Sequence, residues 1–222
     1  AITFDLYEGS EGLAELFARL ATTSPRVVLH RVFEDGDFVF AHVEYDFAEV
    51  VAGFEVFRFE GGFAVEHWDN LQHLAITPNH SGHTVLDGPT VATDQDRTES
   101  NRALVRSFVD EVLVGRRLDR IEEYVETDMI EHDSSGADGA AALQTALAAT
   151  TPAGEPAVRY DTIHRVLADG NFVLGAAEGS QHGAHSANYD LFRVHDDRIA
   201  EHWCSVEPIP PRDQWNNDNG KF

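Results

Sequence analysis

An internal repeat is the feature that most constrains how this chain folds. Residues 30–45 read HRVFEDGDFVFAHVEY and residues 164–179 read HRVLADGNFVLGAAEG, while residues 54–69 read FEVFRFEGGFAVEHWD and residues 189–204 read YDLFRVHDDRIAEHWC. Across these two ungapped blocks, 13 of 32 positions are identical. The offset is 134 residues in the first block (164 − 30) and 135 in the second (189 − 54). Solenoid repeats are roughly 20–50 residues long, so each copy is predicted to be a whole domain.

The repeat predicts a two-domain organisation. The segment 77–97 contains Pro78, Gly82, Gly88 and Pro89 and has no helical periodicity, so we interpret it as a linker. The first copy then spans residues 1–76, and the second spans residues 98–222. In the first copy, the counterparts of the first two helices of the second copy, roughly residues 98–127, are missing. We favour a missing N-terminal segment as the reason. The alternative is that another part of the structure covers the first copy in place of these helices.

The second copy carries the clearer secondary-structure signals. Apolar residues over 104–112 follow a helical stripe, which Asp96 or Thr98 would cap and Gly115 would end. A second short helix is predicted around Leu118, Ile121 and Val125, and a third after Asp138. Four strands follow, over 158–167, 172–178, 189–194 and 199–206, joined by turn sequences such as Ala168-Asp169-Gly170-Asn171. Helices followed by an antiparallel meander predict an α+β fold.

Charge excludes several kinds of partner. The chain has 39 acidic and 16 basic side chains, for a net charge of −23. Nucleic acids and anionic membranes both require a basic patch, so we expect neither as a partner. Adaptation to high salt and an arginine-rich codon usage with a merely acidic surface are both open explanations of the charge.

Cysteine usage and hydropathy constrain compartment and metal chemistry. Cys204 is the single cysteine, so neither an intrachain disulfide nor a cysteine-rich zinc site can form. No apolar run of about 18 residues is present, and the first residues lack the features of a signal peptide. We therefore expect a cytoplasmic protein that does not span a membrane.

Three motifs in the second copy resemble a known domain type. The segment Tyr189–Arg193, the sequence Glu201-His202-Trp203 and the sequence Pro208-Ile209-Pro210 resemble the end of SnoaL-like domains of the NTF2-like superfamily. The sequence Ile130-Glu131-His132-Asp133 is similar to that family's Ile-Gln-His-Asn motif. The resemblance implies two NTF2-like cone domains, each a curved antiparallel sheet packed with N-terminal helices around a pocket; the first copy would lack its leading helices.

The same resemblance implies a chemistry. Characterised SnoaL-like members include polyketide cyclases that close a ring by an intramolecular aldol reaction, with an Asp after the Trp of the last motif acting as acid and base. This sequence has Asp69 at that position in the first copy and Cys204 in the second. Only the first copy is therefore expected to perform proton transfer with a carboxylate there.

Strand alternation places further residues beside that position. His67 and Asp69 share one face of a strand, so we expect them to form the catalytic pair. A carboxyl group in an apolar cavity has a raised pKa and can take and return a proton; a purely structural Asp is the alternative. We expect the substrate-binding residues to be His30, His42, Trp68, His132, His164, Asp190, His202, Trp203 and Cys204.

Two functions remain open at this level. The first is a cofactor-free polyketide cyclase or isomerase acting on a small hydrophobic carbonyl compound. The second is a non-catalytic small-molecule-binding or scaffolding tandem protein, favoured by Cys204 in place of Asp. We expect no cofactor and no metal, because no His-x-His or His-x-x-x-His pair lies within a strand. We also expect the two copies to pack as an intrachain pseudo-dimer, and a further homo-oligomer remains open.

Overall fold

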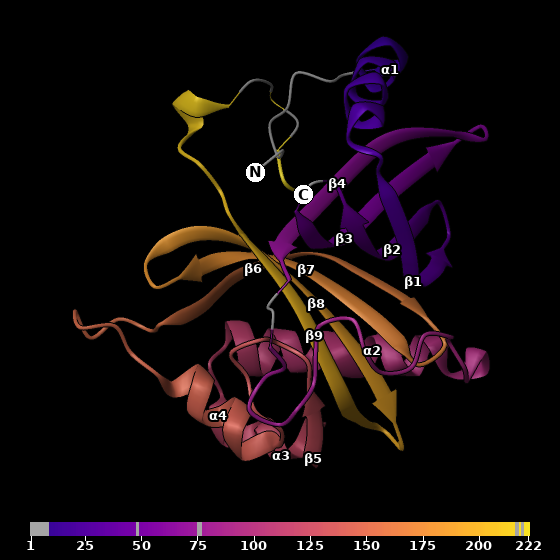
Figure 1. Cartoon of the computed structure of the whole chain (residues 1–222). Helices are drawn as coiled ribbons and strands as arrows, with labels where there is room; N and C mark the ends of the chain where they lie inside the picture. The colour runs from indigo at the N-terminus through magenta and orange to yellow at the C-terminus, as the bar shows by residue number, and fades with distance from the viewer. Residues whose placement is uncertain (1–8, 48, 75–76, 216–217, 219) are drawn as a thin grey trace.

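Two β-sheets, one from each half of the chain, form the framework of the molecule (Figure 1). The computed structural model describes residues 9–47, 49–74, 77–215, 218 and 220–222. The first sheet is an antiparallel meander in chain order, built from β1 (Arg26–Asp35), β2 (Phe38–Asp46), β3 (Val50–Glu60) and β4 (Phe63–His73). The predicted strands of the first copy are thereby confirmed as one sheet.

The second sheet repeats this meander and adds one strand. It has the order β5-β9-β8-β7-β6, with β5 (Val125–Glu131), β6 (Val158–Asp169), β7 (Phe172–Gln181), β8 (Ala184–His195) and β9 (Arg198–Pro208). The four predicted strands are confirmed, although each is longer than predicted. β5 was not predicted, because it pairs in parallel with β9, far away in the sequence.

The hairpin turns of the two sheets use the same sequence signal. Gly36 and Gly170 have φ angles of 59° and 56°, in the left-handed region that favours glycine. Each follows an Asp and joins two strands in register, with Asp35 opposite Phe38 and Asp169 opposite Phe172. The repeated Asp-Gly dipeptide therefore sets equivalent hairpins in both halves.

The helices of the second half follow the predicted order. α2 (Thr98–Phe108) continues into a π-helical turn, η3 (Val109–Val114), and Gly115 ends it. η4 (Leu118–Arg120), α3 (Ile121–Tyr124) and α4 (Ala140–Ala148) come next. Two predicted details are wrong. The N-cap residue of α2 is Arg97, without a side-chain cap, and Val125 begins β5 instead of extending the helix, because parallel pairing with β9 extends the backbone there.

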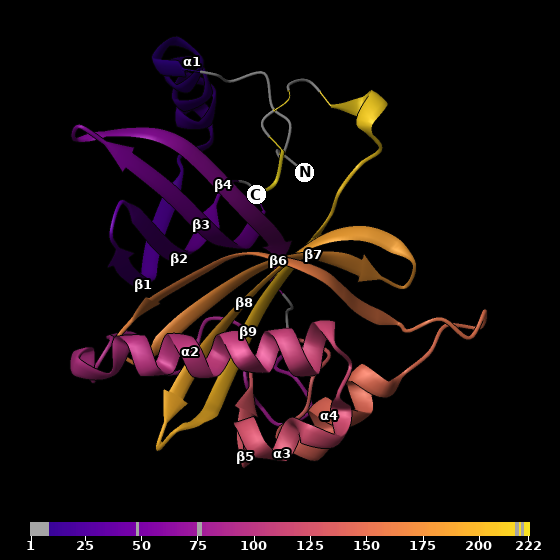
Figure 2. The ribbon, with the colours of Figure 1, turned by 180° about the vertical axis from the view of Figure 1, so that it is seen from behind.

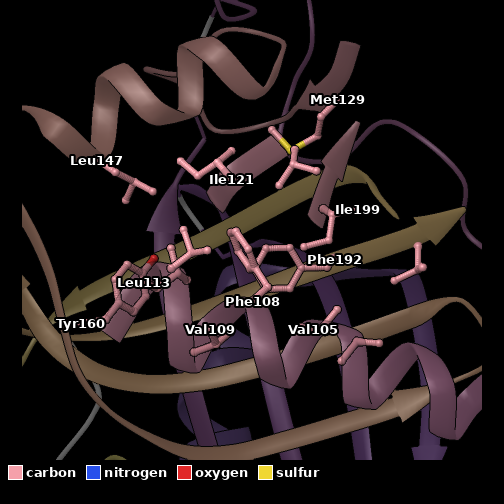
Figure 3. Close-up of a cluster of buried hydrophobic side chains, with 14 of the residues drawn as sticks. Val105, Phe108, Val109, Leu113, Ile121, Met129, Leu147, Tyr160, Phe192 and Ile199 are labelled. Atoms are coloured by element: carbon pink, nitrogen blue, oxygen red, sulfur yellow. The ribbon is translucent and has the colours of Figure 1, made fainter. Parts of the chain in front are cut away.

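One apolar core lies between the second sheet and its helices (Figure 3). Val105, Phe108 and Val109 of α2 and η3 point toward Phe192 and Ile199 of the sheet. All five are at most 2% exposed. Complete burial of such a side chain stabilises a fold by about 1.5–3 kcal/mol. This packing positions α2 along the sheet face that lies away from the first sheet (Figure 2).

A second apolar core lies between the two sheets. Phe40, Phe54 and Trp68 of the first sheet and Leu174, Tyr189, Leu191 and Trp203 of the second belong to one cluster of buried side chains. Two arginine–tryptophan contacts cross between the sheets reciprocally. The guanidinium of Arg31 lies 4.3 Å from the ring centroid of Trp203, and that of Arg165 lies 4.1 Å from the ring centroid of Trp68. Arg31 and Arg165 occupy matching positions in the two similar sequence segments, as do Trp68 and Trp203.

Within the described residues, the opposite face of the first sheet has no helix packed on it comparable to α2. Val27, Leu29 and Val32 of β1 lie on this face, directly opposite Tyr45, Val43 and Ala41 of β2. They are 52%, 62% and 49% exposed. α1 (Gly9–Leu20) has no buried residue and lies at the end of the sheet far from the second half (Figure 1). We call this surface the open face.

The segment between the sheets packs against both halves. The backbone carbonyl oxygen of Asp87 accepts hydrogen bonds from Trp203 Nε1, at 3.0 Å, and from Arg31 Nη2. Asn79 donates its Nδ2 to the carbonyl oxygens of Glu131, at 2.6 Å, and Asp133, at 3.1 Å. The segment thus ties the ends of the sheets together. Among the described residues, no helix is long and apolar enough to cross a membrane.

Candidate functional site

Each half carries a polar cluster at equivalent positions on its last two strands. Glu55 lies opposite Asp69, and Phe57 lies opposite His67, between β3 and β4. The same register places Asp190 opposite Cys204, and Phe192 opposite His202, between β8 and β9. Directly paired residues point to the same side of a sheet. Each cluster therefore contains an acid, a histidine stacked on a phenylalanine, and a third ligand-type side chain.

The first cluster lies on the open face. His67 Nε2 is 2.5 Å from Glu55 Oε2, and Tyr45 also hydrogen bonds with Glu55. The side chain of His67 is 44% exposed, whereas that of Glu55 is 3% exposed. Asp69 Oδ1 lies 3.4 Å from the ammonium nitrogen of the buried Lys221. The imidazole of His67 is thus accessible at the surface, and the buried carboxyl group of Glu55 fixes its orientation.

The pKa values of this pair are shifted for identifiable reasons. Burial raises the pKa of the Glu55 carboxyl, although its hydrogen bond with His67 opposes the shift. Burial acts to lower the pKa of His67, but the hydrogen bond and charge of Glu55, together with the charge of Asp69, outweigh burial and raise it. Burial and the neighbouring Glu55 also raise the pKa of Tyr45. The pKa shifts of Glu55 and His67 therefore depend on each other.

A glycine makes room for the buried carboxyl group. A Cβ atom at Gly53 would lie 2.7 Å from Glu55 Oε1 and 3.0 Å from the ring of Tyr45. Any side chain at this position would displace the carboxyl group that holds His67. Gly53 thus contributes to the geometry of the cluster without touching a reacting group.

The second cluster is buried under the helices of the second half. His202 lies between two carboxylates: its Nε2 is 3.0 Å from Asp190 Oδ1, and its Nδ1 is 2.8 Å from Glu131 Oε2. Tyr160 donates its hydroxyl to Asp190 at 3.1 Å. Cys204 Sγ is 3.5 Å from a carboxylate oxygen of Asp133.

Electrostatics in the second cluster favour a protonated histidine and a protonated thiol. Burial acts to lower the pKa of His202, but the charges and hydrogen bonds of Glu131 and Asp190 outweigh it, so the pKa lies well above its usual value. Burial and the nearby charge of Asp133 raise the pKa of Cys204. A free thiolate nucleophile is thus disfavoured in this environment.

The other predicted histidines lie outside both clusters. His30 and His164 occupy equivalent positions and face Glu44 and Glu178, with nitrogen–oxygen distances of 3.3 and 3.0 Å. His164 lines a shallow surface pocket of about 220 Å³ together with aromatic residues of the C-terminal segment. Neither histidine contacts the polar cluster of its own half within the described hydrogen bonds.

His42 lies on the other face of its sheet. It is fully buried between the sheets, where Arg31 Nη1 is 3.0 Å from its Nδ1. Its neighbour Ala41 lies opposite Glu55, so strand alternation directs His42 away from the open face. His42, expected among the substrate-binding residues, therefore lies on the opposite sheet face from His67 and Asp69, with its ring centroid 6.1 Å from that of His30.

Trp68, Trp203 and His132 lie where the two sheets pack against each other. His132 stacks on Trp203, with ring centroids 4.3 Å apart and an interplanar angle of 7°. Its nitrogens face Asp87, at 2.7 Å, and Glu201, at 3.1 Å. Trp68 takes the corresponding place in the first sheet, beneath Arg165. These aromatic side chains face away from both polar clusters.

Sequence reasoning missed the residues that complete the clusters. Glu55 is the repeat counterpart of Asp190, so the alignment of the copies contained the signal that would have found it. Glu131 lies in the Ile130–Asp133 motif, next to the selected His132. Tyr45, Tyr160 and Lys221 reach the clusters from distant strands or from the C-terminal segment, and no local pattern indicates them.

Three groups of described side chains could hold a metal ion, because one ligand atom from each member lies within 4.8 Å of the others. They are Glu55, His67 and Asp69; Asp190, His202 and Cys204; and His83, Asp87 and His132. The first two are the repeat-related clusters, and the third lies where the connecting segment meets β5.

Part of the second half is similar in sequence to a known domain family. Residues 105–202 match the family of the SnoaL-like domain. The matched segment comprises the last turn of α2, the helices and β5 that follow, and the strands up to His202 in β9. The first sheet has no such family match. No curated protein matches the chain.

The solved structures similar to the chain also correspond to about half of it. An LEH-like epoxide hydrolase from M. tuberculosis is 20% identical over 50% of this chain and 84% of its own, with a TM-score of 0.41. An NTF2-like protein from Mesorhizobium loti is 21% identical over 53% and 99%, with a TM-score of 0.43. A steroid delta-isomerase from Pseudomonas aeruginosa is 20% identical over 50% and 83%, with a TM-score of 0.39.

Proposed function

We propose that the chain is a cofactor-free proton-transfer enzyme, of the isomerase or aldol-cyclase kind, whose active site is the first cluster. The observation that carries this proposal is the 2.5 Å contact between His67 Nε2 and the buried Glu55, beneath an imidazole that is 44% exposed. The second cluster is less suited to turnover, because the side chains of Asp190 and His202 are only 4% and 11% exposed.

The proposed substrate is a small hydrophobic carbonyl compound. Val27, Leu29 and Val32 offer apolar contacts on the same face as Glu55. Phe57 stacks on His67 at 4.3 Å and adds an aromatic surface beside the imidazole. Such a face favours an apolar body with one polar group.

The proposed mechanism uses a single proton. In the basic form, Glu55 accepts the hydrogen bond from His67 Nε2, and the Nδ1 lone pair takes a proton from the carbon next to the substrate carbonyl. The imidazolium is stabilised by Glu55 and by the charge of Asp69. It then returns the same proton to the new alkoxide of an aldol product, or to another carbon of the enolate in an isomerisation. Proton and charge balance within this cycle.

Turnover of a panel of β-keto compounds tests the proposal. His67→Gln removes the proton carrier, so we expect kcat to fall by roughly 10²–10⁴-fold. Asp69→Asn removes a neighbouring charge and should lower kcat less. Glu66→Gln is the matched control, since Glu66 is on the same strand but pairs with Arg58 opposite. Full activity in His67→Gln would assign the open face to binding alone.

The pH profile separates a catalytic role of Glu55 from a merely structural one. Because Glu55 raises the pKa of His67, Glu55→Gln should lower that pKa. The basic form of His67 then persists to lower pH, so the rising limb of kcat against pH should move toward acid. An unmoved limb with a reduced rate at every pH would contradict the assigned role.

We further propose that the two halves arose by duplication and form an intrachain pseudo-dimer. Three sets of equivalent contacts support this: the paired His–Glu contacts of His30 and His164, the two polar clusters, and the reciprocal arginine–tryptophan stacks. Asn70 and its counterpart Ser205 also exchange hydrogen bonds, with Asn70 Nδ2 donating to the Ser205 carbonyl at 2.9 Å and Ser205 Oγ donating to the Asn70 carbonyl at 3.2 Å.

A further inference from the structure

We propose that Asp190, His202 and Cys204 bind one zinc ion inside the second half. One oxygen, one nitrogen and one sulfur atom from these residues lie within 4.8 Å of one another. The neighbouring strands β8 and β9 place all three side chains on the same face of the sheet. His202 and Cys204 are two residues apart on β9, and Asp190 lies directly opposite Cys204 on β8.

The donor types select zinc over the hard divalent cations. Zinc binds imidazole nitrogen, thiolate sulfur and carboxylate oxygen in four-coordinate sites. Magnesium and calcium instead prefer sets composed of oxygen alone. Three protein donors leave a fourth position for a water molecule or another small ligand.

The surroundings of His202 have the form of a zinc site. A zinc-bound histidine usually donates its second ring N–H to a carboxylate or carbonyl oxygen, which fixes the ring orientation. Here Glu131 Oε2 lies 2.8 Å from Nδ1 of His202, so Nε2 is the nitrogen directed toward Asp190. Asn79 and Asp138 in turn hold the backbone of Glu131.

Charge also favours a bound cation. The side chains of Asp190 and Glu131 are 4% and 7% exposed, and Asp133 lies beside the thiol. Within the described part of the chain, no ion pair joins these three carboxylates to Arg or Lys, and His202 is the one cationic side chain between them. Buried negative charge in excess of its counter-charge is costly. A divalent cation would neutralise it, with the thiol proton released to solvent on binding.

The first cluster differs from the second in its third ligand-type side chain and in its nearby positive charge. Asp69 replaces the thiol, and the Lys221 ammonium lies between Asp69 and Glu207, 2.8 Å from the latter. An ammonium already supplies the positive charge there. We therefore assign zinc only to the second cluster. The sequence did not indicate a metal because no ligand pair lies within a single strand at His-x-His or His-x-x-x-His spacing, whereas these donors come from two strands.

Cobalt substitution tests the proposal without any activity assay. The chain is stripped with a chelator and titrated with Co²⁺, which reports thiolate ligation through a sulfur-to-cobalt charge-transfer band in the near ultraviolet. Since Cys204 is the single cysteine, such a band in the wild-type chain can arise from Cys204 alone. We expect the band to saturate at one equivalent and Zn²⁺ to abolish it by displacement. Absence of the band would overturn the proposal.

Variants then check the individual ligands. Cys204→Ser should remove the band and weaken Zn²⁺ binding at least tenfold in competition with a chromophoric chelator. Glu131→Gln should keep the band but weaken binding by roughly 10–100-fold, as expected for a partner of a ligating histidine. His83→Gln, in the third group of ligand-type residues, is the matched control and should change neither. Tight binding that survives Cys204→Ser and is lost in His83→Gln would place the metal elsewhere. None of these outcomes depends on catalysis by the first cluster.

Discussion

At the scale of single residues, His42 is a buried polar group between the sheets that is only partly satisfied. It is fully buried, and its Nε2 has no hydrogen-bond partner within the described structure. Burial lowers its pKa well below the usual value, and the charges of Arg31, His30 and His132 lower it further. Burial also lowers the pKa of Arg31 to about 10, so its guanidinium remains charged at neutral pH. A protonated His42 would therefore lie beside the buried, positively charged Arg31 without a carboxylate to neutralise its own charge.

This arrangement predicts acid sensitivity with a definite sign. A histidine whose pKa is lowered by folding stabilises the fold above its unfolded-state pKa of about 6.5, and this contribution is lost as pH falls below that value. Denaturant unfolding between neutral pH and pH 5 should therefore show a smaller loss of stability in His42→Gln than in the wild type. His73→Gln is the control, because His73 is 78% exposed. If the free energy of unfolding falls equally with pH in the wild type and both variants, His42 is not the source of the acid sensitivity.

At the scale of secondary-structure elements, α1 and α2 differ in how far they pack against the rest of the protein. α1 has no buried residue, and its Leu13 and Phe17 are 48% and 60% exposed. α2 places Val105 and Phe108 in the core, both at most 1% exposed. Helix stability in proteins comes mainly from packing of an apolar face. α2 should consequently unfold with the whole domain, and α1 on its own.

Matched proline substitutions test this difference. Ala14 in α1 and Ala103 in α2 are both exposed and central in their helices. Ala103→Pro should reduce the free energy of unfolding by about 3 kcal/mol, the usual penalty inside a packed helix. Ala14→Pro should leave the main denaturant transition unchanged and reduce only helical circular dichroism. A similar loss of stability in both variants would show that α1 is part of the cooperative unit.

At the scale of the whole molecule, charge opposes compaction. The net charge of −23 is spread over 222 residues. Long-range repulsion between exposed carboxylates is screened as the Debye length falls from about 10 Å at 0.1 M salt to about 3 Å at 1 M. Many acidic side chains are already paired with arginine on the surface, but exposed pairs contribute little individually.

Salt should therefore stabilise the folded chain. We expect the melting temperature to rise continuously from low to molar sodium chloride as self-repulsion is screened. Sucrose at matched osmolarity is the control, because it stabilises by exclusion from the surface without screening charge. Equal melting temperatures at low and high chloride would show that repulsion is not limiting.

The strands were predictable because their determinants are local. Alternating side chains and the Asp-Gly turns at Gly36 and Gly170 specify hairpins from consecutive residues. β5 was not predictable in this way, because its parallel pairing with β9 joins residues more than 70 positions apart. The same limit applies to the clusters. His67 and Asp69 could be placed together by alternation, whereas Tyr45, Glu131 and Lys221 could not.

The sequence by itself determined the α+β class, the repeated meander, and the assignment of His67 with Asp69, and of His202 with Cys204, to one face each. These follow from short-range periodicity and from the sequence similarity between the two segments. Only the tertiary structure decided that Glu55 holds His67, that Lys221 neutralises the first cluster, and that His42 is buried between the sheets. Those contacts depend on which strands are neighbours and which sheet face is covered. Burial and charge balance are properties of that packing and have no signature in a local pattern.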